Sequence, residues 1–306
     1  MSLAVDVLAS GVAGGTSIMY AALGETVGER AGVINLGIEG SMLGGALGAY
    51  IVCVETGNPW AGVLVGGLAG AALALVHAYL VVWRRASQMA SGLTVLFLAL
   101  GMTSLFGASY VGQALTHGFD TWNVPLLHSI PGVGPVLFEH DPLVYLGYVT
   151  VPVVWFVLFK TRLGLLVRTA GERADSLTVH GYDVRWMRTL AVTAGGFLAG
   201  VGGAHLSIAY ANAWFENMVS GRGFIAVALV IFAVWSPVRV MAGAWLFGCA
   251  LALGSALQAR GYQFNQFALD AVPFLLTLVV LTVLGRRTLS SSPAELKKVF
   301  ENAAPE

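Results

Sequence analysis

The chain has 306 residues, of which 57% are hydrophobic and only 10% are Asp, Glu, Lys or Arg, and its mean hydropathy is +0.78. A soluble domain of this length needs about a quarter of its residues charged, so the composition excludes a soluble protein and predicts a polytopic membrane protein. The net charge is zero, and no polybasic arm points to a nucleic-acid partner.

The membrane segments are predicted to be helices. The 39 glycines are typical of helices that pack closely in lipid, and apolar runs such as LVYLGYVTVPVVWFVLF lack the alternation of barrel strands. We therefore expect an all-α fold with about nine transmembrane helices (eight to ten), some of them broken or re-entrant. Apolar runs near 20 residues place the spans at 3–23, 34–55, 60–83, 92–114, 142–159, 189–210, 222–236, 238–260 and 267–285.

The stretch GETVGERAGVINLGIEGSMLGG, residues 24–45, follows the first span. Glu25, Glu29 and Arg30 fit the inner membrane boundary, where they would stay hydrated or pair with one another at modest cost. Asn35 and Glu39 stand four residues apart on one helical face, beside glycines that leave room at the backbone. These two either contact substrate or satisfy backbone groups at a helix break, and the sequence leaves both roles open.

Basic residues set the orientation. The 115–141 loop has no Lys or Arg and is predicted to lie outside, whereas the 160–188 loop is predicted to be cytoplasmic. This choice leaves Arg222 and Arg260 as the two basic residues outside and puts the other fourteen of the 16 inside. It predicts a transmembrane domain over 1–285 and a cytoplasmic tail over 286–306, with the N-terminus outside.

The 160–188 loop is predicted to hold a short surface helix. Thr169 and Glu172 fit a capping box at a helix start, and Gly181 suits the left-handed position after a helix end, which gives a helix over 171–180. Asp183 is a plausible cap for the following helix. The element is either an ordinary loop helix or a docking site for a cytoplasmic partner. The helix after it carries a stripe of small residues suited to close packing, at Gly196, Gly200 and Gly203.

Three stretches resemble the permease subunits of bacterial ABC importers, in the nucleoside-type branch of the ribose and simple-sugar permease family. They are GERAGVINLGIEGSMLGGALGA, then TRLGLLVRTAGERADSLTVHGYDVRWMRTLAVTAGGFLAGVGGAHLS, and GRGFIAVALVIFAVWSPVRVMAGAWLFG. The resemblance implies a non-catalytic subunit of the inner membrane, paired with a second permease, cytoplasmic ATPases and an external binding protein. It also implies an ATPase-coupling role for Gly171, Glu172, Ala174, Ser176, Leu177 and Gly181. In the family a Pro and an Ala pair often follow the Gly-Glu, and this chain departs from that pattern with Ala174, Ser176 and Leu177.

The chain has no phosphate-binding G-x-x-x-x-G-K-S/T motif, so ATP and Mg²⁺ are expected on a partner ATPase, and no cofactor or metal on this chain. H-E-x-x-H, C-x-x-C and G-x-S-x-G are also missing, which argues against an enzyme and leaves no catalytic residues to assign. His205 lies alone on an apolar helix and is predicted to be packed or hydrogen-bonded.

Two other classes stay open. An ion-gradient-driven carrier of a small polar solute would use Glu39 and Asp270 as its main candidate carboxylates, and a scaffold protein is the third possibility. For an importer, amide, carboxylate and aromatic side chains suit nucleoside recognition. The predicted pathway residues are Asn35, Glu39, Phe97, Asn212, Trp214 and Phe224, with an interfacial anchor as the alternative role of Trp214.

Overall fold

The computed structural model describes residues 2–261, 265, 269, 271–273, 275, 278–279, 282 and 292–301. Within them the chain is a bundle of long helices with one two-stranded antiparallel sheet. The elements are α1 (Leu3–Arg30), α2 (Ile38–Thr56), α3 (Pro59–Ala78), α4 (Gln88–Gly107), β1 (Trp122–Asn123), α5 (Val133–Leu137), β2 (Glu139–His140), α6 (Pro142–Lys160), α7 (Arg162–Glu172), α8 (Ala174–Val179), α9 (Val184–His205), α10 (Arg222–Phe232), α11 (Pro237–Ala259) and α14 (Ala294–Glu301).

Seven of the described helices are long and apolar enough to cross a membrane, and they include all the predicted spans up to residue 260 except 222–236. The all-α polytopic fold is confirmed. In place of that span the structure has α10, which at 11 residues is about 16 Å long and reaches across about half of a bilayer. The predicted span 267–285 lies outside the described residues apart from isolated positions.

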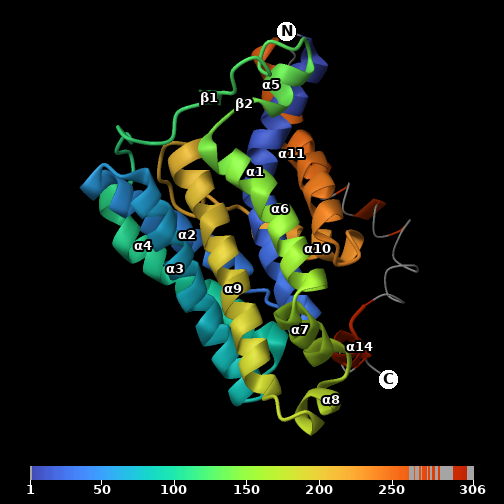
Figure 1. Ribbon diagram of the computed structural model, residues 1–306. Helices are drawn as coiled ribbons and strands as arrows, with labels where there is room; N and C mark the ends of the chain where they lie inside the picture. The colour runs from blue at the N-terminus through green and yellow to red at the C-terminus, as the bar shows by residue number, and fades with distance from the viewer. Residues whose placement is uncertain are drawn as a thin grey trace.

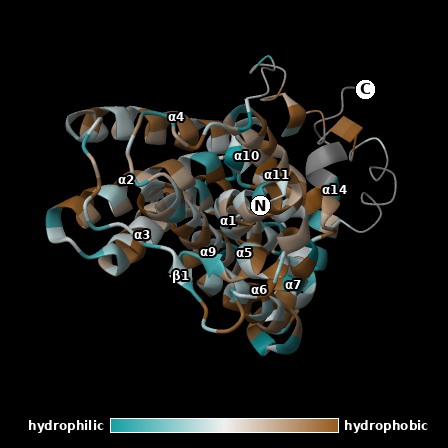
Figure 2. Ribbon diagram, turned by 90° about the horizontal axis from the view of Figure 1, so that it is seen from above, coloured by the Kyte–Doolittle hydropathy of each residue, from teal (hydrophilic) through white to brown (hydrophobic). Residues whose placement is uncertain are grey.

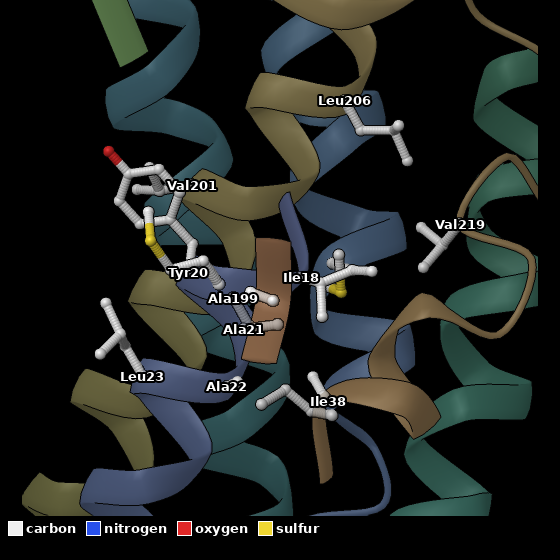
Figure 3. Packing of buried hydrophobic residues seen from close by; sticks show 14 of the residues in the cluster. Ile18, Tyr20, Ala21, Ala22, Leu23, Ile38, Ala199, Val201, Leu206 and Val219 are labelled. Atoms are coloured by element: carbon white, nitrogen blue, oxygen red, sulfur yellow. The ribbon is translucent and has the colours of Figure 1, made fainter. Parts of the chain in front are cut away.

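The bundle is built around α1 and α9. Helix α9 packs against α1, α2 and α3, and α1 also packs against α10 and α11. Seen from above, α1 lies in the middle of the bundle, and the outward sides of α4, α6 and α11 are largely hydrophobic (Figure 2). Figure 3 shows the core between these helices, where Ile18 and Tyr20 of α1 lie near Ala199 and Val201 of α9. This arrangement is typical of a bundle that buries its centre and presents its rim to lipid.

Glycines allow the close approach of α9 to its neighbours. A methyl group on Gly200 would collide with the Gly66 carbonyl oxygen of α3, and one on Gly203 would collide with the Met42 carbonyl oxygen of α2. On Gly196 a methyl group would meet the Gly70 carbonyl oxygen at 2.7 Å. Backbones approach to this distance in lipid only where no side chain separates them.

The two ends of the bundle differ in content. The N-terminus, α5 and the small sheet lie at one end, and α7, α8 and α14 lie at the other (Figure 1). The second end carries most of the described arginines, so it corresponds to the predicted cytoplasmic side. Arg222, predicted to be outside, is the first residue of α10 and is partly buried, and its Nη1 donates to the Met218 carbonyl oxygen at 3.0 Å.

Candidate transport site

The acidic residues of the 24–45 stretch are buried. The exposed fractions of Glu25, Glu29 and Glu39 are 2%, 1% and 3%, respectively. The expectation that Glu25 and Glu29 stay hydrated is therefore wrong: α1 continues to Arg30, and other parts of the chain supply hydrogen-bond donors to both carboxylates. A carboxylate buried in a membrane bundle is costly without such partners, which makes these residues the natural place to look for a site.

Glu39 caps the N-terminus of α10. Its Oε1 accepts a hydrogen bond from the Gly221 backbone N–H at 2.7 Å, and its Oε2 accepts one from the Gly223 N–H at 2.6 Å. The first N–H groups of a helix have no partner inside the helix, and the helix dipole favours an anion there. Glycine is needed at 223, because a Cβ would lie 2.6 Å from the Glu39 Cα. A side chain of α2 thus completes a helix whose N-cap residue, Gly221, lies 182 residues later.

The C-terminal end of α10 is held from α1. The Trp235 indole N–H donates to Glu29 Oε2 at 2.6 Å, and Arg30 Nη2 donates to the Trp235 carbonyl oxygen at 3.2 Å. Val234 and Trp235 have φ values of 50° and 52°, a region that β-branched and bulky residues rarely adopt. Strained backbone of this kind persists where surrounding contacts fix it, and it gathers at functional sites.

Asn35 supports the break between α1 and α2. Its backbone N–H donates to Glu25 Oε1 at 2.7 Å, and its Oδ1 accepts from the Gly37 N–H at 2.9 Å. Asn35 is thus tied to α1 and to the start of α2, whereas Glu39 holds the start of α10. Asn35 Oδ1, Glu25 Oε1 and both carboxylate oxygens of Glu39 each accept a hydrogen bond from a backbone N–H group.

The other predicted pathway residues are spread over the molecule. Phe97 is 67% exposed on α4, and Phe224 is exposed in the first turn of α10. Trp214 is 2% exposed and its indole packs on Gly107 of α4, so the alternative role of an interfacial anchor is wrong. Asn212, with a φ of 47°, lies in the turn after α9. The structure therefore does not gather the four into one pocket.

A polar cavity of about 380 Å³ opens at the end of the bundle that carries the N-terminus. Asn212 lines it, so one predicted pathway residue belongs to this cavity. The sequence interpretation missed most of its other polar residues, although the run FEHDP at the end of the outer loop was a signal of a polar helix start. The lining residues include Asp120, Glu139, His140, Asp141 and Tyr210.

Asp141 organises the base of this cavity. Its Oδ1 accepts from the Leu143 N–H at 2.9 Å and so caps α6, while its Oδ2 lies 3.4 Å from Nε2 of the fully buried His205. Burial by itself would raise the pKa of the Asp141 carboxyl, but His205 and the backbone N–H groups outweigh it and hold the pKa below its usual value. Burial lowers the pKa of the neighbouring His140. At neutral pH the cavity therefore presents the ionised Asp141 carboxylate beside the neutral imidazole of His140.

The cytoplasmic loop forms two helices instead of the one predicted over 171–180. Thr169 is not a cap, because its hydroxyl donates to the Leu165 carbonyl oxygen inside α7 at 2.8 Å. Helix α7 begins after Thr161, whose side chain accepts from Gly164, and it ends at Glu172. The left-handed Gly181 (φ 79°) and the cap at Asp183 are confirmed, since Asp183 Oδ1 accepts from the Arg185 N–H at 2.8 Å.

The predicted coupling residues differ in exposure, and some of them are buried within this loop. Gly171 is buried at the end of α7, and Leu177 is 3% exposed because it packs inward from α8. Ala174 and Ser176 are half-buried on α8, while Glu172 and Gly181 are exposed. The end of α8 also carries Val179, which is 84% exposed and was not predicted.

The sequence matches a family model described as the permease component of the branched-chain amino acid transport system over residues 7–284. The chain belongs to this permease family. It is a multi-pass protein of the cytoplasmic membrane, and the resemblance to ABC importer permeases is confirmed.

Similar proteins include several ABC permeases. A putative glucose ABC transporter permease, TsgC13 of Haloferax volcanii, is 41% identical over 96% of this chain and 89% of its own. The nucleoside ABC transporter permease NupC of Lactococcus lactis is 34% identical, covering 88% of each chain. The guanosine ABC transporter permease NupQ of Bacillus subtilis is 33% identical, covering 87% of each. No solved structure matches the permease.

Proposed function

We propose that this permease imports a nucleoside or nucleobase, or a related simple sugar, that an external binding protein delivers. Two of the similar permeases are named for nucleosides and one for glucose, and a ribose permease of Escherichia coli is 26% identical over 83% of the chain. A sugar ring with several hydroxyl groups is common to nucleosides, glucose and ribose. The cargo in this proposal is therefore a compound that carries such a ring or the base attached to it.

The energy comes from ATP and Mg²⁺ held by cytoplasmic ATPase partners, and this permease is the non-catalytic subunit. A second permease completes the membrane part. The observation that carries this part of the proposal is α8, a short helix at the inner end of the bundle with Val179 exposed at its tip. An exposed apolar side chain on a polar helix suits insertion into a groove of a partner.

Substrate is proposed to enter by the outer polar cavity. The carboxylates of Asp120 and Glu139 and the amide of Asn212 can accept or donate hydrogen bonds to sugar hydroxyls and base edges. Asn35 and Glu39, in contrast, are proposed to brace the broken helix, because their oxygens are engaged with backbone N–H groups. This assignment also removes support from an ion-gradient carrier, for which Glu39 was a main candidate; Asp270 lies outside the described residues.

A ligand screen of the cognate external binding protein tests the substrate class. Guanosine, guanine, ribose and glucose are each added to the purified binding protein, and its thermal midpoint is measured. A ligand that binds only the folded form raises the midpoint, and the rise grows with the logarithm of the ligand concentration relative to its dissociation constant. A rise with any of the four supports the proposal, and a rise with none of them overturns it.

A further inference from the structure

Three segments of the chain meet at Arg188, in the second turn of α9. Its Nε donates to the carbonyl oxygen of Ala31, just after α1, at 3.2 Å. Its Nη2 donates to the carbonyl oxygen of Ala170 in the last turn of α7 at 2.9 Å and lies 3.2 Å from Glu295 Oε2 of α14. One guanidinium thus links α1, the loop helix α7 and the C-terminal helix.

The chemistry of these contacts is specific. The last carbonyl groups of a helix have no partner within it, and a cation is favoured at the negative end of the helix dipole. Arg188 meets both conditions for α1 and α7 at once. The flat, forked guanidinium can direct several N–H groups at separate acceptors, which a lysine ammonium on its flexible stem does less well.

Helix α14 closes over this junction. The backbone N–H of Ala294, its first residue, donates to Glu172 Oε2 at 3.3 Å, and Leu296 is fully buried. Gly32 has a φ of 86°, and a Cβ there would lie 2.9 Å from the Cβ of Glu295. The C-terminal helix therefore contacts the last residue of α7 and the turn after α1 together, and Figure 1 shows α14 beside α7.

No side chain separates α7 from α1 at this point. A Cβ on Gly171 would collide with the Arg30 carbonyl oxygen and lie 3.0 Å from the Gly32 nitrogen. Arg30 in turn donates to Trp235 at the end of α10. The end of α7 is therefore in direct contact with the end of α1, which in turn holds the residue that follows α10. A displacement of α7 would be felt at both places.

We propose that Arg188 is a positioning residue for coupling, and that together with α14 it clamps the α7–α8 segment to the inner end of α1. Movement of α8 by the ATPase is then passed to α1 and α10 instead of being absorbed by the loop. Contiguous packed groups can carry such coupling, but only measured energetic coupling demonstrates it. The inference rests on the proposed ATP-driven function.

The test uses the complete transporter, with its ATPases and binding protein, reconstituted in liposomes. The measured quantity is substrate taken up per ATP hydrolysed, and assembly is checked by co-purification. Arg188→Gln removes the cation while keeping polar atoms, and Glu295→Gln removes the charge on α14 that pairs with Arg188. Arg239→Gln is the matched control, because Arg239 is an exposed arginine in the first turn of α11 that the sequence also assigns to the cytoplasmic side.

We expect Arg188→Gln to lower uptake per ATP about fivefold or more, in the range typical of coupling between sites, while ATP hydrolysis continues. Glu295→Gln is expected to give a smaller loss, and the double variant to be no worse than Arg188→Gln, because the two residues share one interaction. Arg188→Lys is expected to recover only part of the coupling. The control keeps the wild-type ratio.

An unchanged ratio in assembled Arg188→Gln transporter overturns the inference, as do strictly additive losses in the double variant. If Arg188→Gln fails to assemble, Glu295→Gln decides, since an unchanged ratio there removes α14 from the clamp. Failure of the proposed function is a different result: the wild-type complex would then show no ATP-dependent uptake.

Discussion

Glu39 offers the sharpest test of how the half-length helix is held. Glu39→Gln keeps the size of the side chain but replaces one acceptor oxygen with an NH₂ group, which then faces a backbone N–H of Gly221 or Gly223. A hydrogen bond to a charged group contributes about 1.5–3 kcal/mol. Losing one of the two therefore favours opening of the first turn of α10 by about that amount.

Hydrogen exchange of backbone amides measures this opening directly. A cost of about 1.5–3 kcal/mol corresponds to exchange that is roughly tenfold to 150-fold faster in a peptide covering the start of α10. Glu39→Ala, which removes both acceptors, is expected to exceed Glu39→Gln. The matched control is Glu55→Gln, at the exposed outer end of the same helix, where the carboxylate accepts only from Tyr110 Oη among the described contacts. Unchanged exchange at α10 in both Glu39 variants would refute the capping role.

Three further predictions follow from the same contacts. Trp235→Phe removes the donor to Glu29 Oε2 and is expected to cost about 1.5–3 kcal/mol of stability. The cost is measured by thermal unfolding in detergent. Trp60→Phe, at an exposed position, should cost far less. Gly200→Ala forces α9 away from α3 and is expected to cost about 1–3 kcal/mol of stability or to abolish folding. Gly101→Ala is the control, because a Cβ there meets no atom within 4 Å and the change should be neutral. Equal yields of folded protein from the two variants would contradict this. Asp141→Asn keeps the helix cap but removes the charge. Because the folded pKa of Asp141 lies below its unfolded value, its ionised form stabilises the protein above the unfolded pKa, and this contribution is lost as pH falls through the folded pKa. The wild type is therefore expected to melt higher than Asp141→Asn near neutral pH and to lose that difference in acid, and a difference independent of pH would count against it.

The sequence predicted most of the helices because the bilayer imposes a length and an apolar composition on each span. The helices α3, α6, α9 and α11 lie within a few residues of their predicted positions. The sequence prediction failed at the end of α1. Glu25 and Glu29 resemble boundary residues locally, and their burial depends on a backbone N–H at Asn35 and on an indole 206 residues away.

The 160–188 loop shows a second limit of local patterns. Thr169 and Glu172 have the spacing of a capping box, but α7 starts earlier, at the Thr161 cap, and runs through both residues. The candidate site was found only in part for a similar reason. Asn35 and Glu39 could be named from polarity and spacing, whereas the hydrogen bonds of Glu39 with Gly221 and Gly223 are long-range contacts that no single segment encodes.

The most direct test of the whole account is uptake by the reconstituted transporter. The permease, a second permease, the ATPases and the binding protein are placed in liposomes, and labelled guanosine and glucose are supplied outside. Uptake of one of them that requires ATP and persists when ionophores collapse all ion gradients is the predicted result. Uptake by this chain without any ATPase, driven by an imposed ion gradient, would contradict it.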